Sequence, residues 1–149
     1  MAKFKYRLAT LLRLRESARD ERRTQLAQAD RAEAMVRQEQ ARLAKESAEL
    51  SARIRAAAGA GEVHVDCLLD AQRFDLVLKA RHHELAQQRR QVEAEIQRRR
   101  QALVEANREV QVLEKLRQRQ RARWQEEENR REVKRLDEVA VRSHVKEEP

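Results

Sequence analysis

The sequence predicts an all-α protein in which two long helices fold back on each other as an antiparallel coiled-coil hairpin, with the second helix longer than the first. Three observations support this fold class: a three-four apolar spacing, a single cluster of helix-breaking residues, and a composition too polar for a wide core. Aromatic residues make up 3% and charged residues 40% of the 149 residues. Because burial of apolar area drives folding, such a chain must share its apolar side chains along a narrow seam between helices.

The first helix is expected over about residues 4–57. Ala, Leu, Glu, Gln and Arg dominate this segment, and all of them are good helix formers. The seam positions follow the three-four spacing of a coiled coil. They are Leu8, Leu12, Leu26, Ala29, Glu33, Val36, Gln40, Leu43, Ser47, Leu50, Ile54 and Ala57.

The tip of the hairpin is expected at residues 58–65, because the only two glycines, Gly59 and Gly61, lie there. Asp66 is the candidate cap of the second helix. We expect this helix over about residues 66–139 and a flexible tail at residues 140–149, so that residues 1–149 form a single hairpin. Its seam repeats the same spacing through Leu68, Ala71, Asp75, Leu78, His82, Leu85, Arg89, Val92, Ile96, Arg99, Leu103, Ala106, Val110 and Leu113.

The two seams match when the chain folds back at the glycines. The expected apolar pairs are Ile54 with Leu68, Leu43 with Leu78, Val36 with Leu85, Ala29 with Val92, Leu26 with Ile96, Leu12 with Val110 and Leu8 with Leu113. Glu33 falls opposite Arg89, which pairs opposite charges, whereas Arg22 opposite Arg99 is expected to be a weak layer. Since both seams are used within one chain, we expect a monomer.

This pairing leaves the second helix unsupported beyond about residue 121. The unsupported length contains Trp124, the only tryptophan, followed by Val133, Leu136 and Val139. Two interpretations remain open. These apolar groups bind a partner protein, or Trp124 folds onto Phe4 or Tyr6 at the open end of the hairpin.

The sequence offers no catalytic, cofactor-binding or metal-binding constellation, so we expect a protein that is not an enzyme. The two glycines cannot form a phosphate-binding loop, and no Ser, His and Asp set lies on a sharp turn. Neighbouring His82 and His83 are interpreted as structural residues. The lone Cys67 has no partner for an internal disulfide and is typical of a reducing cytoplasm.

The net charge of +8 and the pI near 10.3 raise nucleic acid and anionic membranes as possible partners. Acidic residues are interspersed along most of the chain, which favours solvated helix faces over a nucleic-acid-binding surface. Residues 1–23 are the exception, because eight basic and three acidic residues give them a charge of +5. We interpret this start as a protein-docking patch, and expect no nucleic acid and no direct membrane insertion.

Four segments, in this order, resemble the FliJ family of flagellar type III export proteins. They are FKYRLATLLRLRE at 4–16, RQALVEA at 100–106, LEKLR at 113–117 and REVKRLDEVA at 131–140, with Trp124 between the last two. The likeness spans nearly the whole chain.

The resemblance implies a cytoplasmic, stalk-like component at the flagellar base that is peripheral to the inner membrane through its partners only. Those partners are the hexameric export ATPase, which it binds and stimulates, the cytoplasmic part of the export gate, and export chaperones whose recycling it assists. The ATPase-binding end implied by the likeness comprises Phe4, Tyr6, Arg7, Trp124, Leu136, Asp137 and Glu138. The implied gate-binding residues are Phe74, Leu78 and His83, although the family has more tyrosines around that segment. The alternatives are an injectisome secretion stalk and a generic scaffold or nucleic-acid-binding coiled coil.

Overall fold

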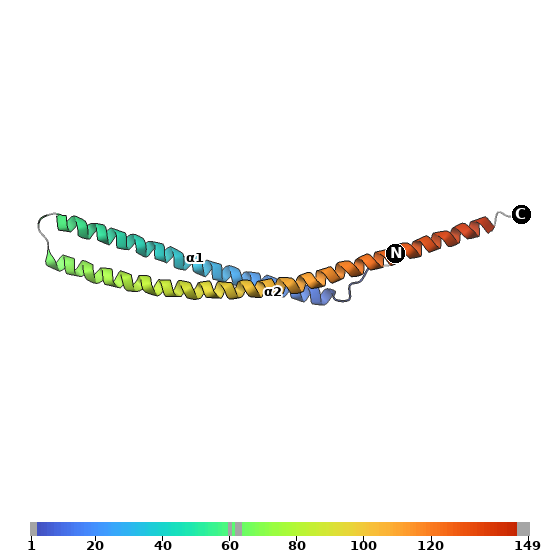
Figure 1. Cartoon of the computed structure of the whole chain (residues 1–149), viewed down its shortest axis with the longest axis horizontal. Coiled ribbons are helices and arrows are strands. Elements are labelled where there is room, and N and C mark those ends of the chain that lie inside the picture. Colours follow the sequence, from blue (N-terminus) through green and yellow to red (C-terminus); the bar gives the residue numbers. More distant parts are fainter. Residues whose placement is uncertain (1–2, 60, 62–63, 146–149) are drawn as a thin grey trace. The chain divides into compact units, whose positions relative to one another are not determined.

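The structure is a computed structural model that describes residues 3–59, 61 and 64–145, with side chains as far as residue 142. Helix α1 spans Ala9–Gly59 and helix α2 spans Val65–Val145. The two helices pack against each other in antiparallel orientation, and α2 is the longer, with 81 residues against 51 (Figure 1). The predicted fold class is therefore confirmed.

Contacts divide the chain into two compact units, each built from both helices. The first unit contains Met1–Asp20 and Val104–Pro149, and the second contains Glu21–Leu103. The division falls next to the layers around Arg22 and Arg99, where charged residues interrupt the apolar seam. The expectation that residues 1–149 form a single domain stays a prediction.

A narrow apolar seam holds each unit together. In the second unit the buried apolar residues are Ala29, Leu43, Leu78 and Ile96, and in the first unit they are Leu12 and Val110. Val110 is only 1% exposed, which makes it the most deeply buried of them. Leu43 and Leu78 were expected to face each other, as were Leu12 and Val110, and all four are buried.

The charged layer at Glu33 shows the register of the seam directly. Glu33 is 8% exposed, and its carboxylate lies 3.6 Å from Nε of Arg89 on the opposite helix. This is the partner that the fold-back pairing predicts. The glycine turn therefore sets the register that the two apolar seams require.

The expected start of the first helix at residue 4 was wrong, because α1 begins at Ala9. Residues 3–6 are not helical, and the first backbone bonds run from the Ala9 N–H to the Tyr6 carbonyl and from the Leu12 N–H to the Leu8 carbonyl, at 3.2 and 2.9 Å. The physical reason is tertiary: the side chains of Phe4 and Tyr6 contact α2, which a continuing α-helix would not allow. At its other end α1 continues to Gly59 instead of ending at residue 57.

The boundaries of the second helix also differ from expectation. Helix α2 begins at Val65, so Asp66 lies inside its first turn and does not precede the helix as a cap. At this position its negative charge interacts favourably with the positive end of the helix dipole. The helix continues to Val145, which places residues 140–145 in the helix and not in a tail. No glycine or proline lies in this stretch, so no strong helix breaker ends the helix at residue 139. The remainder of the expected tail, residues 146–149, lies outside the described residues.

The turn between the helices contains a backbone conformation that favours glycine. Gly61 has a φ of +82°, in the left-handed region that L side chains rarely adopt. Over the residues that the structure describes, neither helix contains a stretch apolar enough to cross a lipid bilayer.

Candidate protein-binding surfaces

The N-terminal residues 3–8, which we call the strap, lie against α2 in the first unit. The Tyr6 hydroxyl donates a hydrogen bond of 3.0 Å to the backbone carbonyl of Leu113. The Phe4 and Trp124 rings lie 6.0 Å apart between centroids, with their planes at 49°. Of the two interpretations of Trp124, the structure shows the one in which it packs onto the chain's own start.

The strap changes what the open end offers to a partner. Phe4, Tyr6 and Trp124 are half-buried in contacts within the chain, whereas Arg7, the other sequence-predicted residue of the strap, is exposed. The three rings therefore position the strap before any partner binds. Trp124 is therefore already packed against Phe4 and is not a freely exposed anchor residue.

A cleft of about 320 Å³ lies beside the strap. Its walls combine ring and aliphatic carbon with two cations and one carboxylate. The lining residues are Phe4, Tyr6, Ala9, Leu12, Arg13, Glu16 and Arg117. With aromatic walls and flanking charge, this cleft suits the insertion of a side chain from a protein partner.

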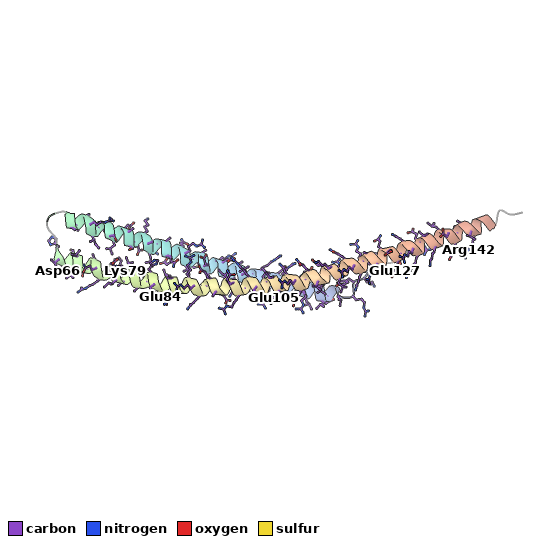
Figure 2. The ribbon with its side chains drawn as sticks, in the orientation of Figure 1. Asp66, Lys79, Glu84, Glu105, Glu127 and Arg142 are labelled. Carbon is purple, nitrogen blue, oxygen red and sulfur yellow. The ribbon has the colours of Figure 1, made fainter. Side chains whose placement is uncertain are left out.

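Beyond Trp124, the last part of α2 is a single exposed helix. From residue 125 to residue 142 every side chain is exposed except Glu128, which is half-buried. Asp137 and Glu138 are exposed, and Leu136 is 62% exposed, among further exposed apolar residues at Val133, Val139 and Val141. Glu127 and Arg142 mark this extension in Figure 2. Exposed apolar groups of this number on one helix are typical of a protein-binding surface.

Of the three candidate gate-binding residues near the tip, two are exposed and one is buried. Phe74 is 49% exposed and His83 is exposed, with its Nε2 3.2 Å from the Gln87 side-chain nitrogen. Leu78 is 4% exposed because it lies in the seam, so it cannot contact a partner while the helices are paired. Its assignment to an outer surface conflicted with its own heptad position.

Sequence reasoning missed three exposed apolar residues in the same area, namely Leu69, Leu76 and Val77. A spacing of seven places Leu69, Leu76 and His83 along one face of α2. These positions lie out of phase with the seam, and that mismatch is the signal by which the sequence could have revealed them.

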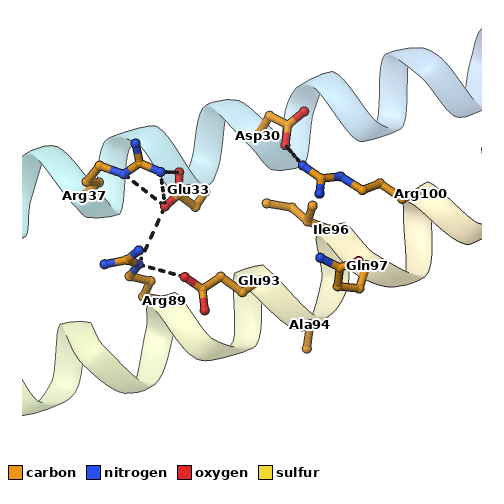
Figure 3. Close-up of a pocket in the computed structure, with 9 residues that line it drawn as sticks. All are labelled: Asp30, Glu33, Arg37, Arg89, Glu93, Ala94, Ile96, Gln97 and Arg100. Carbon is orange, nitrogen blue, oxygen red and sulfur yellow. Dashed lines mark hydrogen bonds and ion pairs between the residues drawn. The ribbon is translucent and has the colours of Figure 1, made fainter.

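The most elaborate polar cluster surrounds Glu33 (Figure 3). Arg37 donates to both carboxylate oxygens of Glu33 at 2.8 Å, while Arg89 also pairs with Glu93 at 2.9 Å. The adjoining cleft of about 580 Å³ holds three arginines and three carboxylates, Arg37, Arg89, Arg100, Asp30, Glu33 and Glu93, with Ala94, Ile96 and Gln97. Since these charges balance one another within the chain, the cluster supports the register of the two helices.

A second charged cluster lies three layers further along the seam of α2, past Val92 and Ile96. Arg99 donates a hydrogen bond of 2.8 Å to the Glu95 carboxylate and a second one to the backbone carbonyl of Gln25. The bond from Arg99 lowers the pKa of the Glu95 carboxyl from its ordinary value of 4.5, against a smaller opposing effect of desolvation, and the charge of Arg98 lowers it further.

Among the residues that the structure describes, no group of three or more His, Cys, Asp or Glu side chains is arranged to hold a metal ion, and Cys67 is an exposed free thiol. The surfaces that remain are suited to binding proteins. They are the strap with its cleft, the α2 extension, and the outer face of α2 near the tip.

The family model of the Flagellar FliJ protein matches residues 4–148. No curated protein and no solved structure gives a significant match to the chain. The matched range contains the strap from Phe4 onward and both helices in full, including the α2 extension. The chain therefore belongs to the FliJ family, and it is a component of the flagellar protein export apparatus.

Proposed function

We propose that this protein binds the hexameric export ATPase and stimulates its turnover, without hydrolysing anything itself. The observation that carries the proposal is the α2 extension, a single helix with exposed apolar residues that continues past the Phe4–Trp124 contact. A ring-shaped ATPase can enclose one or two helices at its centre. The strap and its cleft then contribute Phe4, Tyr6 and Arg7 to the same end.

The extension combines apolar and charged groups in the way that a protein interface requires. Leu136 is followed directly by the exposed carboxylates of Asp137 and Glu138. An apolar centre excludes water and supplies most of the binding energy, while surrounding charges give orientation. Leu136 is therefore the expected anchor, with Asp137 and Glu138 at the rim.

The second proposed contact is with the cytoplasmic part of the export gate, through the outer face of α2 near the tip. Phe74 and His83 remain in this surface, and Leu69 and Leu76 join it because they are exposed on the face of His83. Leu78 is buried in the seam, where its packing holds this part of α2 against α1. Assistance in export-chaperone recycling, location in the cytoplasm at the flagellar base, and a monomeric state complete the proposed role.

The decisive experiment replaces Leu136 with Glu and measures stimulation of the cognate export ATPase by the full chain. We expect stimulation to fall at least tenfold, because a charge in the centre of an interface must be desolvated. Met35→Glu is the matched control, since Met35 is also exposed but lies on α1 in the second unit. Full stimulation by the Leu136→Glu variant would overturn the proposed docking end.

A parallel experiment separates the gate contact from the ATPase contact. The Leu76→Glu variant should lose binding to the purified cytoplasmic part of the export gate and should still stimulate the ATPase. Leu14→Glu is the control, because Leu14 is exposed to a similar degree at the other end of α1. Undiminished gate binding by Leu76→Glu would exclude this face.

A further inference from the structure

The whole net charge of the protein is concentrated where the strap meets α2. The strap contains Lys3, Lys5 and Arg7, and the segment 115–123 of α2 contains Lys115, Arg117, Arg119, Arg121 and Arg123. Neither segment contains an acidic residue. These eight cations equal the net charge of +8, and the remaining 26 basic residues balance the 26 acidic residues of the chain. We call this region the basic collar.

The fold holds these two like-charged segments together. The Tyr6 hydrogen bond to Leu113 and the Phe4–Trp124 contact fix the strap on either side of the basic stretch of α2. All eight cationic side chains are exposed, and none of them takes part in an ion pair between residues that the structure describes. Acidic residues flank the stretch: Glu114 precedes it, and Glu126 and Glu127 follow Arg123 by three and four residues. Glu16 lines the same cleft as Arg117.

Several arginines outside the collar form ion pairs on their own helix. Arg37, Arg89, Arg99, Arg130 and Arg131 each pair with a carboxylate on their own helix three or four residues away. In the collar the residues between the cations are Gln118, Gln120 and Ala122, with Leu116, so that no compensating charge is present. Unpaired like charges held close together raise the free energy of the closed strap until anions neutralise them.

The geometry of the collar favours a protein partner over a membrane. Cations at alternate positions step by about 200° around an α-helix and so occupy opposite sides of α2, whereas a flat bilayer reaches one side only. The collar also lacks a broad apolar face for insertion into lipid. Nucleic acid is disfavoured because Phe4, Tyr6 and Trp124 are engaged within the chain and are not free to stack on bases.

We propose that the basic collar binds a carboxylate-rich protein surface that encloses α2, and that this binding stabilises the closed strap. The inference rests on the proposed function for the identity of the partner, the central opening of the ATPase ring. Carboxylates on several sides would neutralise the strap and α2 together. The Phe4–Trp124 contact then forms more completely in the complex than in the free chain.

The test uses the full chain with poly-L-glutamate as the probe, and the single Trp124 as the fluorescent reporter. Binding should shift the Trp124 emission and weaken steeply as salt is raised from about 0.05 to 0.3 M, since screening shortens the reach of each charge. Replacing Arg119, Arg121 and Arg123 together with Gln should weaken binding at least tenfold. The control replaces three exposed arginines outside the collar, Arg53, Arg81 and Arg90, which removes the same charge.

If the two triple variants lost the same fraction of their affinity for poly-L-glutamate, net charge alone would explain binding. This result would overturn the proposal that the collar is a specific binding site. Tighter binding to vesicles containing phosphatidylglycerol, or to a DNA duplex, at 0.15 M salt would overturn the assignment of a protein partner. The Leu136→Glu variant should bind poly-L-glutamate normally, so the failure of the ATPase model and the failure of the collar are distinguishable. If the collar variant stimulated the ATPase fully, the acidic partner would not be the ATPase ring.

Discussion

Phe4 and Trp124 are in ring contact, with centroids 6.0 Å apart, although they lie near opposite ends of the sequence. Together with the Tyr6 hydrogen bond to Leu113, this contact fixes a non-helical strap across α2. The strap decides where α1 begins, half-buries the only tryptophan, and assembles the basic collar. Its stability is the first property to measure.

We expect Phe4→Ala to shift the Trp124 emission to longer wavelength, because the indole ring becomes more exposed to water. The free energy of unfolding should fall by about 1 kcal/mol, the usual contribution of an aromatic pair. Urea denaturation followed by circular dichroism measures this change. Leu14→Ala, at an exposed position on α1, is the control and should leave both readings unchanged.

Glu33→Gln should lower the free energy of unfolding by roughly 1–3 kcal/mol, because it removes the ionised partner of Arg37 and Arg89 from a buried position. Glu33→Leu should lower it less, or raise it, since a leucine fills the seam and both arginines can turn to water. Chemical denaturation of the two variants beside Glu39→Gln, an exposed glutamate, decides the point. Identical losses in the Gln and Leu variants would contradict this account.

Arg22→Leu should stabilise the hairpin by about 1 kcal/mol, because leucine can pack on the aliphatic stem of Arg99. Arg22 is exposed and donates a hydrogen bond of 3.2 Å to the side-chain oxygen of the half-buried Gln25. Amide exchange in wild type should be fastest, among the paired residues, in the layers flanking Arg22 and Arg99. Uniform exchange along both helices would be inconsistent with a weak layer there.

The Glu95 carboxyl predicts a specific dependence of stability on pH. Its pKa is lower in the folded state than the ordinary value of 4.5, chiefly because Arg99 bonds to the carboxylate. Its stabilising contribution is therefore complete above about pH 4.5 and is lost as the pH falls through the folded pKa. In thermal melts between pH 6 and 3, Glu95→Gln should lose less stability than wild type on acidification. If stability fell with pH to the same extent in wild type and in the Glu95→Gln variant, the Glu95 carboxylate would not contribute to the pH dependence.

Cysteines at Val36 and Leu85, in a chain with Cys67→Ser, should form a disulfide within one chain. The two positions are expected to face each other in the seam of the second unit, and both are half-buried. Electrophoresis without reductant should show a faster monomer band and no dimer. A pair at Met35 and Leu76, which are exposed, is the negative control.

The sequence by itself determined the fold class, the position of the turn and the register of the seam. These properties follow from local spacing: a three-four repeat selects one helix face, and the glycines fix where the chain reverses. The opposition of Glu33 and Arg89 could be found by counting from the turn. The burial of Leu78 was available in the same pattern, because Leu78 occupies a seam position.

The tertiary structure alone decided the course of residues 3–8 and the surroundings of Trp124. Helix propensity favours a helix from Phe4 onward, but the burial of two aromatic rings against α2 outweighs the few backbone hydrogen bonds of one helical turn. The collar likewise depends on cations of the strap lying beside cations of residues 115–123, and no local sequence pattern predicts that proximity. Contacts between residues far apart in the chain depend on where the helices end, and only the packed structure determines that.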